Sequence, residues 1–188
     1  MRIVILGWGS LILEKGEFPL KTDWITGSPY LPVEFSRIST TREGALTLVL
    51  DPKNGINVPT RYAESKRIHI EDAICDLRCR EGTVVRRIGF VNLIDGSQRC
   101  NVYPEAANII RKWASDNRWD AVIWTDLPSN FKEKTQVDFS VGEALKYLKK
   151  LPNDGASKAR EYFSIVPEDV QTPLRRRIND DPWLLEEG

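Results

Sequence analysis

The chain has 188 residues, of which 27 are Lys or Arg and 27 are Asp or Glu, so its formal net charge at pH 7 is zero. This balance gives no electrostatic case for nucleic acid or an anionic membrane surface as the main partner. No stretch approaches the roughly twenty apolar residues of a membrane-spanning helix, and three cysteines are too few for a disulfide framework. We therefore expect a cytoplasmic globular protein with free thiols.

The first half of the chain is rich in short strands and carries one helix. A buried strand at residues 3–6 is expected to end in the loop Gly7-Trp8-Gly9-Ser10. Asn54-Gly55 predicts a hairpin turn between two strands. A helix is expected at 70–82, because acidic residues open it, basic residues close it and Gly82 stands where a C-terminal cap belongs. The other strands are expected at residues 32–39, 45–50, 58–63, 84–93 and 98–103.

The second half is rich in helices, at 104–117, 140–151 and 156–166, with one strand at 119–125. After Pro167 we expect a short helix in which Arg175–Arg177 form a solvated face. The fold class predicted is α+β, with a mixed or barrel-like sheet and helices packed around it. One domain is expected over residues 1–188, with a strand-rich core at 1–103 that carries the site and a helix-rich part at 104–188.

The loop after the first strand is the first candidate for ligand binding. Gly7 and Gly9 permit a positive φ or a close approach of the backbone, and the amides of such a loop suit a carboxylate or a phosphate. A plain turn accounts for the same residues. A dinucleotide fingerprint is incomplete, because Ile12 stands where its third glycine belongs, and no phosphate-binding Gly-Lys-Ser/Thr follows.

Glu81 is the second candidate. Helical spacing continues the apolar stripe of Ile70, Ile74 and Leu77 onto this carboxylate at the last turn of the helix. Burial and the partial negative charge of a helix C-terminus would both raise its pKa, which suits a general base near neutral pH. The alternative is a frayed helix end, with Glu81 in solvent and paired with a neighbouring arginine.

Together, Trp8-Gly9-Ser10-Leu11 and Leu77-Arg78-Cys79-Arg80-Glu81-Gly82 resemble two motifs of the gamma-glutamylcyclotransferase-like family. The resemblance covers roughly the first half of the chain. It implies a general acid/base role for Glu81 and substrate binding, largely through backbone amides, by Gly7, Trp8, Gly9, Ser10, Leu11 and Ile12. The implied partner is a small-molecule gamma-glutamyl amine or amide, which cyclises to 5-oxoproline without a cofactor or a metal.

The chain departs from the family pattern at three points. Trp8 replaces the usual tyrosine, Arg78 stands where aspartate is common, and residues 83–93 contain no tyrosine. Arg80 would also lower the pKa of Glu81 if the two side chains pair. A second hypothesis is therefore a catalytically silent protein that binds a small molecule or regulates a partner on the same scaffold.

A zinc site is a further alternative, because His69, Cys75, Cys79 and Cys100 are metal-ligand types. Their spacing matches no common structural zinc site. We therefore expect the three cysteines to be buried free thiols and expect no metal.

Overall fold

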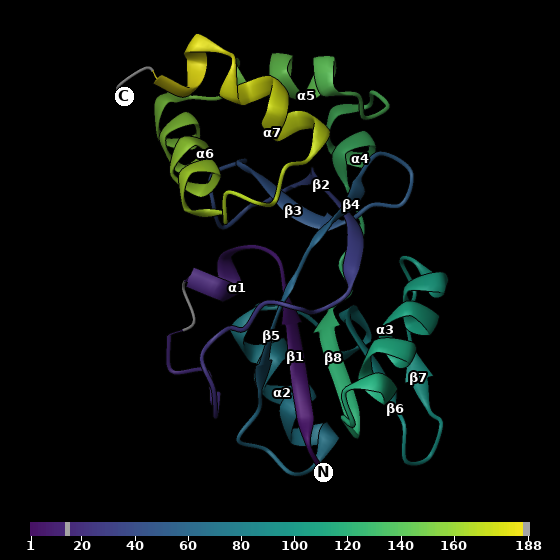
Figure 1. The fold of residues 1–188 in the computed structure, drawn as a ribbon. Helices are drawn as coiled ribbons and strands as arrows, with labels where there is room; N and C mark the ends of the chain where they lie inside the picture. Colours follow the sequence, from purple (N-terminus) through teal and green to yellow (C-terminus); the bar gives the residue numbers. More distant parts are fainter. Residues whose placement is uncertain (14–15, 186–188) are drawn as a thin grey trace. The chain divides into compact units, whose positions relative to one another are not determined.

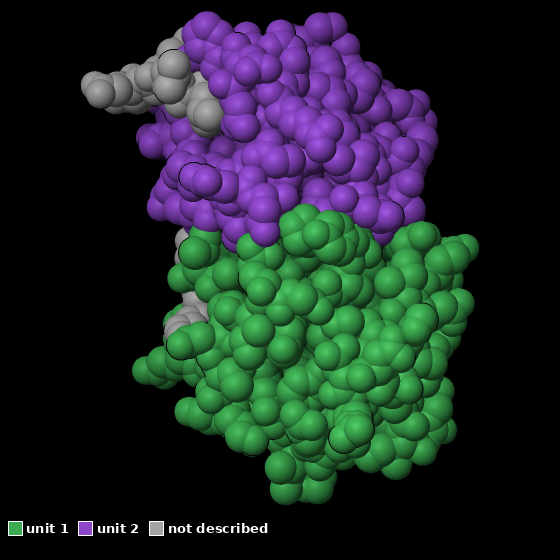
Figure 2. All heavy atoms as spheres, in the orientation of Figure 1, with its two compact units in different colours: residues 1–31, 59–127 green, residues 32–58, 128–188 purple. Residues whose placement is uncertain are grey.

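The computed structural model describes residues 1–13 and 16–185, which fall into two compact units (Figure 2). Unit 1 consists of residues 1–31 and 59–127, and unit 2 of residues 32–58 and 128–188. This division differs from the one expected at residue 103. The strands within 32–58 belong with the C-terminal helices, whereas residues 104–127 belong with the N-terminal strand.

Unit 1 is built on a five-stranded mixed sheet of order β5-β1-β8-β6-β7 (Figure 1). Its strands are β1 (Ile3–Gly7), β5 (Arg61–Glu64), β6 (Ile88–Asn92), β7 (Gln98–Arg99) and β8 (Ala121–Thr125). β1 is parallel to β8 and antiparallel to β5, and β6 is antiparallel to β8. The helices of unit 1 are α1 (Ser10–Leu13), α2 (Ile70–Arg80), η1 (Val85–Arg87) and α3 (Pro104–Asp116).

The apolar stripe of α2 covers one face of this sheet. Alternate residues of a strand point to the same face of a sheet. On the face that α2 covers, buried strand residues and the apolar residues of α2 form one core cluster. Its members are Ile3, Ile5, Ile88, Ala121 and Ile123 from the strands and Ile70, Ala73, Ile74 and Leu77 from α2. Leu11 of α1 belongs to the same cluster. α3 packs against β6 and β8. Where β6 passes β8, Gly89 is required, because a Cβ at this position would overlap the Trp124 ring.

Unit 2 contains a three-stranded sheet of order β3-β2-β4, formed by β2 (Tyr30–Ile38), β3 (Leu46–Leu50) and β4 (Ile56–Pro59). Its helices are α4 (Phe131–Thr135), α5 (Val141–Leu148), α6 (Asn153–Ile165), α7 (Pro173–Asn179) and η2 (Pro182–Leu185). The Phe35 ring of β2 stacks on Phe163 of α6 with centroids 4.2 Å apart and meets Tyr162 edge-on. These aromatic contacts join sheet and helices into one core.

A carboxyl group is buried between the sheet and the helices of unit 2. Glu34 is 0% exposed. Its Oε1 accepts hydrogen bonds from the Thr172 hydroxyl at 2.6 Å and from the Phe35 N–H at 2.8 Å, and its Oε2 accepts one from the Leu174 N–H at 3.1 Å. Glu34 thus ties β2 to the first turn of α7. Burial raises its pKa from 4.5 to about 7, although these hydrogen bonds act in the opposite direction.

The α+β class with a mixed sheet and helices is confirmed, but the barrel-like arrangement is wrong for the described residues, which form two open sheets and no closed barrel. The hairpin expected at Asn54-Gly55 is also wrong, because β4 is the neighbour of β2 and not of β3. Asp51 holds this turn by accepting the Asn54 N–H at 3.0 Å. Gly55 is needed because the chain passes so close to Val33 that a Cβ would overlap its carbonyl group.

The four longer helices predicted from the sequence are present as α2, α3, α5 and α6. The solvated face expected for the basic triplet is wrong at Arg175, which is 6% exposed. Its guanidinium donates to the carbonyls of Pro167 and Val166 at 2.6 and 2.9 Å, so it closes the loop before α7. Within the described ranges, no helix is both long and apolar enough to cross a membrane.

Candidate functional site

The strand directions of unit 1 bring the two sequence candidates toward one edge of its sheet. Because β1 and β8 are parallel and β6 is antiparallel to β8, β1 and β8 end at the edge where β6 begins. Residues 7–12 leave the end of β1 at this edge. The C-terminal end of α2 leads into β6 through residues 81–87. Leu11 of the loop and Leu77, one helical turn before Glu81, share a core cluster.

The loop itself is compact. Trp8 is 5% exposed and Leu11 is equally buried, whereas Ser10 and Ile12 are half-buried. The Ile12 N–H donates to the Gly9 carbonyl at 3.0 Å and closes the single turn of α1. Gly7 provides the close approach that the sequence suggests, but toward the indole ring of Trp24, whose Cη2 would lie 3.0 Å from a Cβ at this position.

Glu81 is the C-cap residue of α2. Its N–H donates to the Leu77 carbonyl at 3.0 Å, so the helix continues to this residue instead of fraying before it. Gly82 follows with φ +56°. Its N–H donates to the Cys79 carbonyl at 3.2 Å, and the Thr83 N–H donates to the Arg78 carbonyl at 3.1 Å. These bonds form a Schellman motif, which is the glycine cap predicted from the sequence.

The Glu81 side chain is 18% exposed, and its Oε1 lies 3.9 Å from the Arg80 Nη1 in a partly shielded ion pair. A carboxylate in this setting can accept a proton from a bound molecule and return it. The neighbouring guanidinium lies close enough to pair with the ionised carboxylate.

The alternative zinc ligands do not come together. Among the described residues, no group of three or more His, Cys, Asp or Glu side chains is arranged to hold a metal ion. Cys75 and Cys79 are exposed rather than buried, and the Arg78 Nη2 lies 3.1 Å from the Cys79 sulfur. Cys100 is half-buried, and its Sγ donates to the Tyr103 carbonyl at 2.9 Å. Burial raises the pKa of the Cys100 thiol to about 11, so it is a poor nucleophile.

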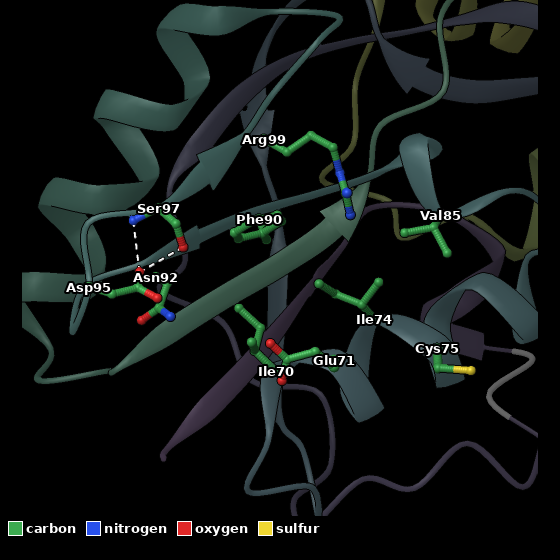
Figure 3. A pocket seen from close by; sticks show the side chains of 10 residues that line it. All are labelled: Ile70, Glu71, Ile74, Cys75, Val85, Phe90, Asn92, Asp95, Ser97 and Arg99. Atoms are coloured by element: carbon green, nitrogen blue, oxygen red, sulfur yellow. Dashed lines mark hydrogen bonds between the residues drawn. The ribbon is translucent and has the colours of Figure 1, made fainter.

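Sequence reasoning missed a pocket of about 350 Å³ between α2 and the β6–β7 hairpin (Figure 3). Its apolar wall is formed by Ile70, Ile74, Val85 and Phe90, and its polar groups come from Glu71, Cys75, Asn92, Asp95, Ser97 and Arg99. These residues are supplied by α2, η1, β6 and β7 and by the turn between the two strands. No motif with a fixed spacing spans these segments, so the pattern along the chain carries no signal for the pocket.

Comparisons of the chain with protein-family models, with curated proteins and with solved structures find no match.

Proposed function

We propose that this protein is a gamma-glutamylcyclotransferase-like enzyme, with the corresponding fold in unit 1, that converts a gamma-glutamyl amine or amide to 5-oxoproline and a free amine. One observation carries the proposal. Glu81 is a shielded carboxylate at the capped end of α2, and its helix shares a core cluster with the loop 7–12 at one edge of the sheet. The two motifs that resemble the family thus belong to the same unit.

The proposed reaction uses few protein groups, because it is intramolecular and the enzyme mainly has to hold the reactive conformer. Glu81 takes a proton from the α-ammonium group of the substrate. The freed amine attacks the γ-carbonyl carbon, and a five-membered ring closes as the oxyanion forms. The oxyanion then collapses, the bond to the leaving amine breaks, and Glu81 returns the proton to that amine. The ring nitrogen gives up its second proton in the same way, and the departing amine takes it up, so the products are the neutral lactam and an ammonium ion.

In this proposal, the backbone amides of Gly9, Ser10 and Leu11 bind the substrate carboxylate or the developing oxyanion. The Trp8 side chain is buried, since it is 5% exposed, so little of its ring is open to a bound molecule. The bound molecule therefore meets backbone groups and the half-buried Ser10, and specificity for the leaving amine lies outside the loop.

The second candidate is a protein that binds a small molecule on the same site without turning it over. Two observations favour it. The family tyrosine is replaced by the buried Trp8, so a phenol hydroxyl is absent from the loop. Arg80 lies 3.9 Å from the Glu81 carboxylate, and such pairing weakens a base.

The experiment that separates the two candidates is a product assay. The purified chain is incubated with a panel of gamma-glutamyl amines, dipeptides and amides, and 5-oxoproline is measured by mass spectrometry. Release of 5-oxoproline that disappears in Glu81→Gln supports the enzyme. Absence of turnover across the panel overturns the enzyme proposal. If a ligand also shifts the NMR signals of the amides at residues 9–11, the result supports the binding protein.

A further inference from the structure

The pocket between α2 and the β6–β7 hairpin is a second site, which neither Glu81 nor residues 7–12 line. Its volume of about 350 Å³ is in the range of small-molecule sites. An apolar middle section is formed by Ile70, Ile74 and Phe90 (Figure 3). Such a wall excludes water and strengthens the polar contacts made beside it.

Arg99 provides a cationic group in this pocket. Its Nε donates to the Ile88 carbonyl at 2.7 Å, and the guanidinium lies 5.0 Å from the centre of the Phe90 ring. These contacts fix the plane of the guanidinium. Its Nη2 is buried and has no hydrogen-bond partner among the described residues. A buried donor without a partner is costly, which a bound acceptor would remedy.

A carboxylate outside the pocket lining also acts on Arg99. Burial lowers the pKa of the guanidinium, and the nearby Asp126 carboxylate acts in the opposite direction. The Asp126 carboxylate accepts the Asn101 N–H at 2.6 Å. A guanidinium with an unpartnered Nη2 is suited to a carboxylate, which accepts charge-assisted hydrogen bonds from it.

In the view of the pocket, the Arg99 guanidinium lies to the right of Phe90, Asp95 lies to its left, and Glu71 lies below it (Figure 3). Asp95 is held by the Ser97 hydroxyl and N–H at 2.6 and 2.8 Å, and these bonds lower the pKa of its carboxyl group. Glu71 is exposed and lines the same pocket. Two carboxylates against one guanidinium leave an excess negative charge, which disfavours a ligand that is only an anion.

We infer that this pocket binds a small zwitterion, with its carboxylate on Arg99, its ammonium group toward Glu71 and Asp95, and an apolar segment along Phe90 and Ile74. The ligand class is thus an amino acid whose two charged ends are separated by methylene groups or a ring. This inference concerns a site away from Glu81 and does not rest on the proposed function.

Calorimetric titration of the full chain tests the ligand class. The probes are 4-aminobutanoate, 6-aminohexanoate and 8-aminooctanoate, each compared with the carboxylic acid and the amine of equal length. We expect at least one zwitterion to bind about tenfold or more tightly than both of its single-charge analogues, because a charge-assisted hydrogen bond is lost with either end. Equal binding of an analogue, or no binding by any zwitterion, would overturn the inference.

Two substitutions locate the carboxylate end. Arg99→Gln should weaken binding about tenfold or more, and Arg99→Lys should retain part of the affinity because the charge remains. Arg86→Gln is the matched control, because Arg86 is exposed on η1 and does not line the pocket. Unchanged affinity in Arg99→Gln would contradict the inference.

The rate of cysteine alkylation can be measured on the unsubstituted chain, so this second test does not depend on whether the Arg99 variants fold. Cys75 and Cys79 are both exposed on α2 and both lie beside Arg78, but only Cys75 lines the pocket. The tightest zwitterion should slow alkylation of Cys75 by N-ethylmaleimide and leave Cys79 unaffected. Equal rates at both thiols with and without the ligand would place the ligand elsewhere and refute the inference.

Discussion

Glu34 makes the stability of unit 2 depend on pH. The substitution Glu34→Gln removes the ionisable group while it keeps the size of the side chain. Because burial raises the pKa of Glu34 from 4.5 to about 7, the folded chain retains a proton that the unfolded chain releases between these pH values. The stabilisation from the neutral carboxyl group is therefore complete below pH 4.5 and is lost as the pH rises through 7.

The expected magnitude follows from the two pKa values. Each factor of ten in a proton equilibrium corresponds to about 1.36 kcal/mol, so a rise from 4.5 to about 7 corresponds to about 3 kcal/mol in total. Most of this falls between pH 5 and pH 8. We compare the free energy of unfolding of the natural chain with that of Glu34→Gln. The difference, natural chain minus variant, should decrease by about 2 to 3 kcal/mol from pH 5 to pH 8.

Urea unfolding at pH 5, 6, 7 and 8, followed by circular dichroism, measures this difference. Hydrogen exchange at the Leu174 amide, which donates to Glu34, reports on unit 2 directly. Glu161→Gln is the control, because Glu161 is exposed on α6 and should show no such change with pH. A difference between the natural chain and Glu34→Gln that stays constant from pH 5 to pH 8 would refute the reasoning.

Two glycines give further predictions. Gly89→Ala should lower the free energy of unfolding by about 1 to 3 kcal/mol, because a methyl group overlaps the Trp124 ring; an unchanged urea midpoint would show that the ring is free to move away. Gly82→Ala should cost about 1 kcal/mol in a thermal melt, since φ is +56° at this position, and should reduce any activity of Glu81 by loosening the helix cap. Full stability together with full activity in Gly82→Ala would argue against that cap as a support for Glu81.

Local signals in the sequence predicted much of the secondary structure. The stripe of Ile70, Ile74 and Leu77 and the glycine at position 82 were sufficient for α2 and its cap, because both depend on residues within one helix. The pairing of strands within the sheets could not be predicted in this way, because it depends on residues far apart in the sequence. Asn54-Gly55 is a strong hairpin signal, yet β4 lies beside β2, and Gly55 closely approaches Val33 of that strand.

Part of the candidate site could also be proposed from local sequence signals. Glu81 and the loop at 7–12 were singled out from short motifs, and both belong to unit 1, but their role as one site stays a prediction. The unpartnered Nη2 of Arg99 and its pocket could not be found, because three separated segments of the chain create them. The burial of Arg175 was missed because its partners are backbone carbonyls of a loop, which leave no pattern in the side chains.

The rate of 5-oxoproline release by Glu81→Gln, relative to the natural chain on its best gamma-glutamyl substrate, tests the central claim most directly. Asp72→Asn, an exposed acidic position on the same helix, serves as the control. Removal of a general acid/base typically costs about 10²- to 10⁴-fold in rate. We expect a loss in this range for Glu81→Gln and no significant loss for Asp72→Asn. Equal rates for Glu81→Gln and the natural chain would contradict it.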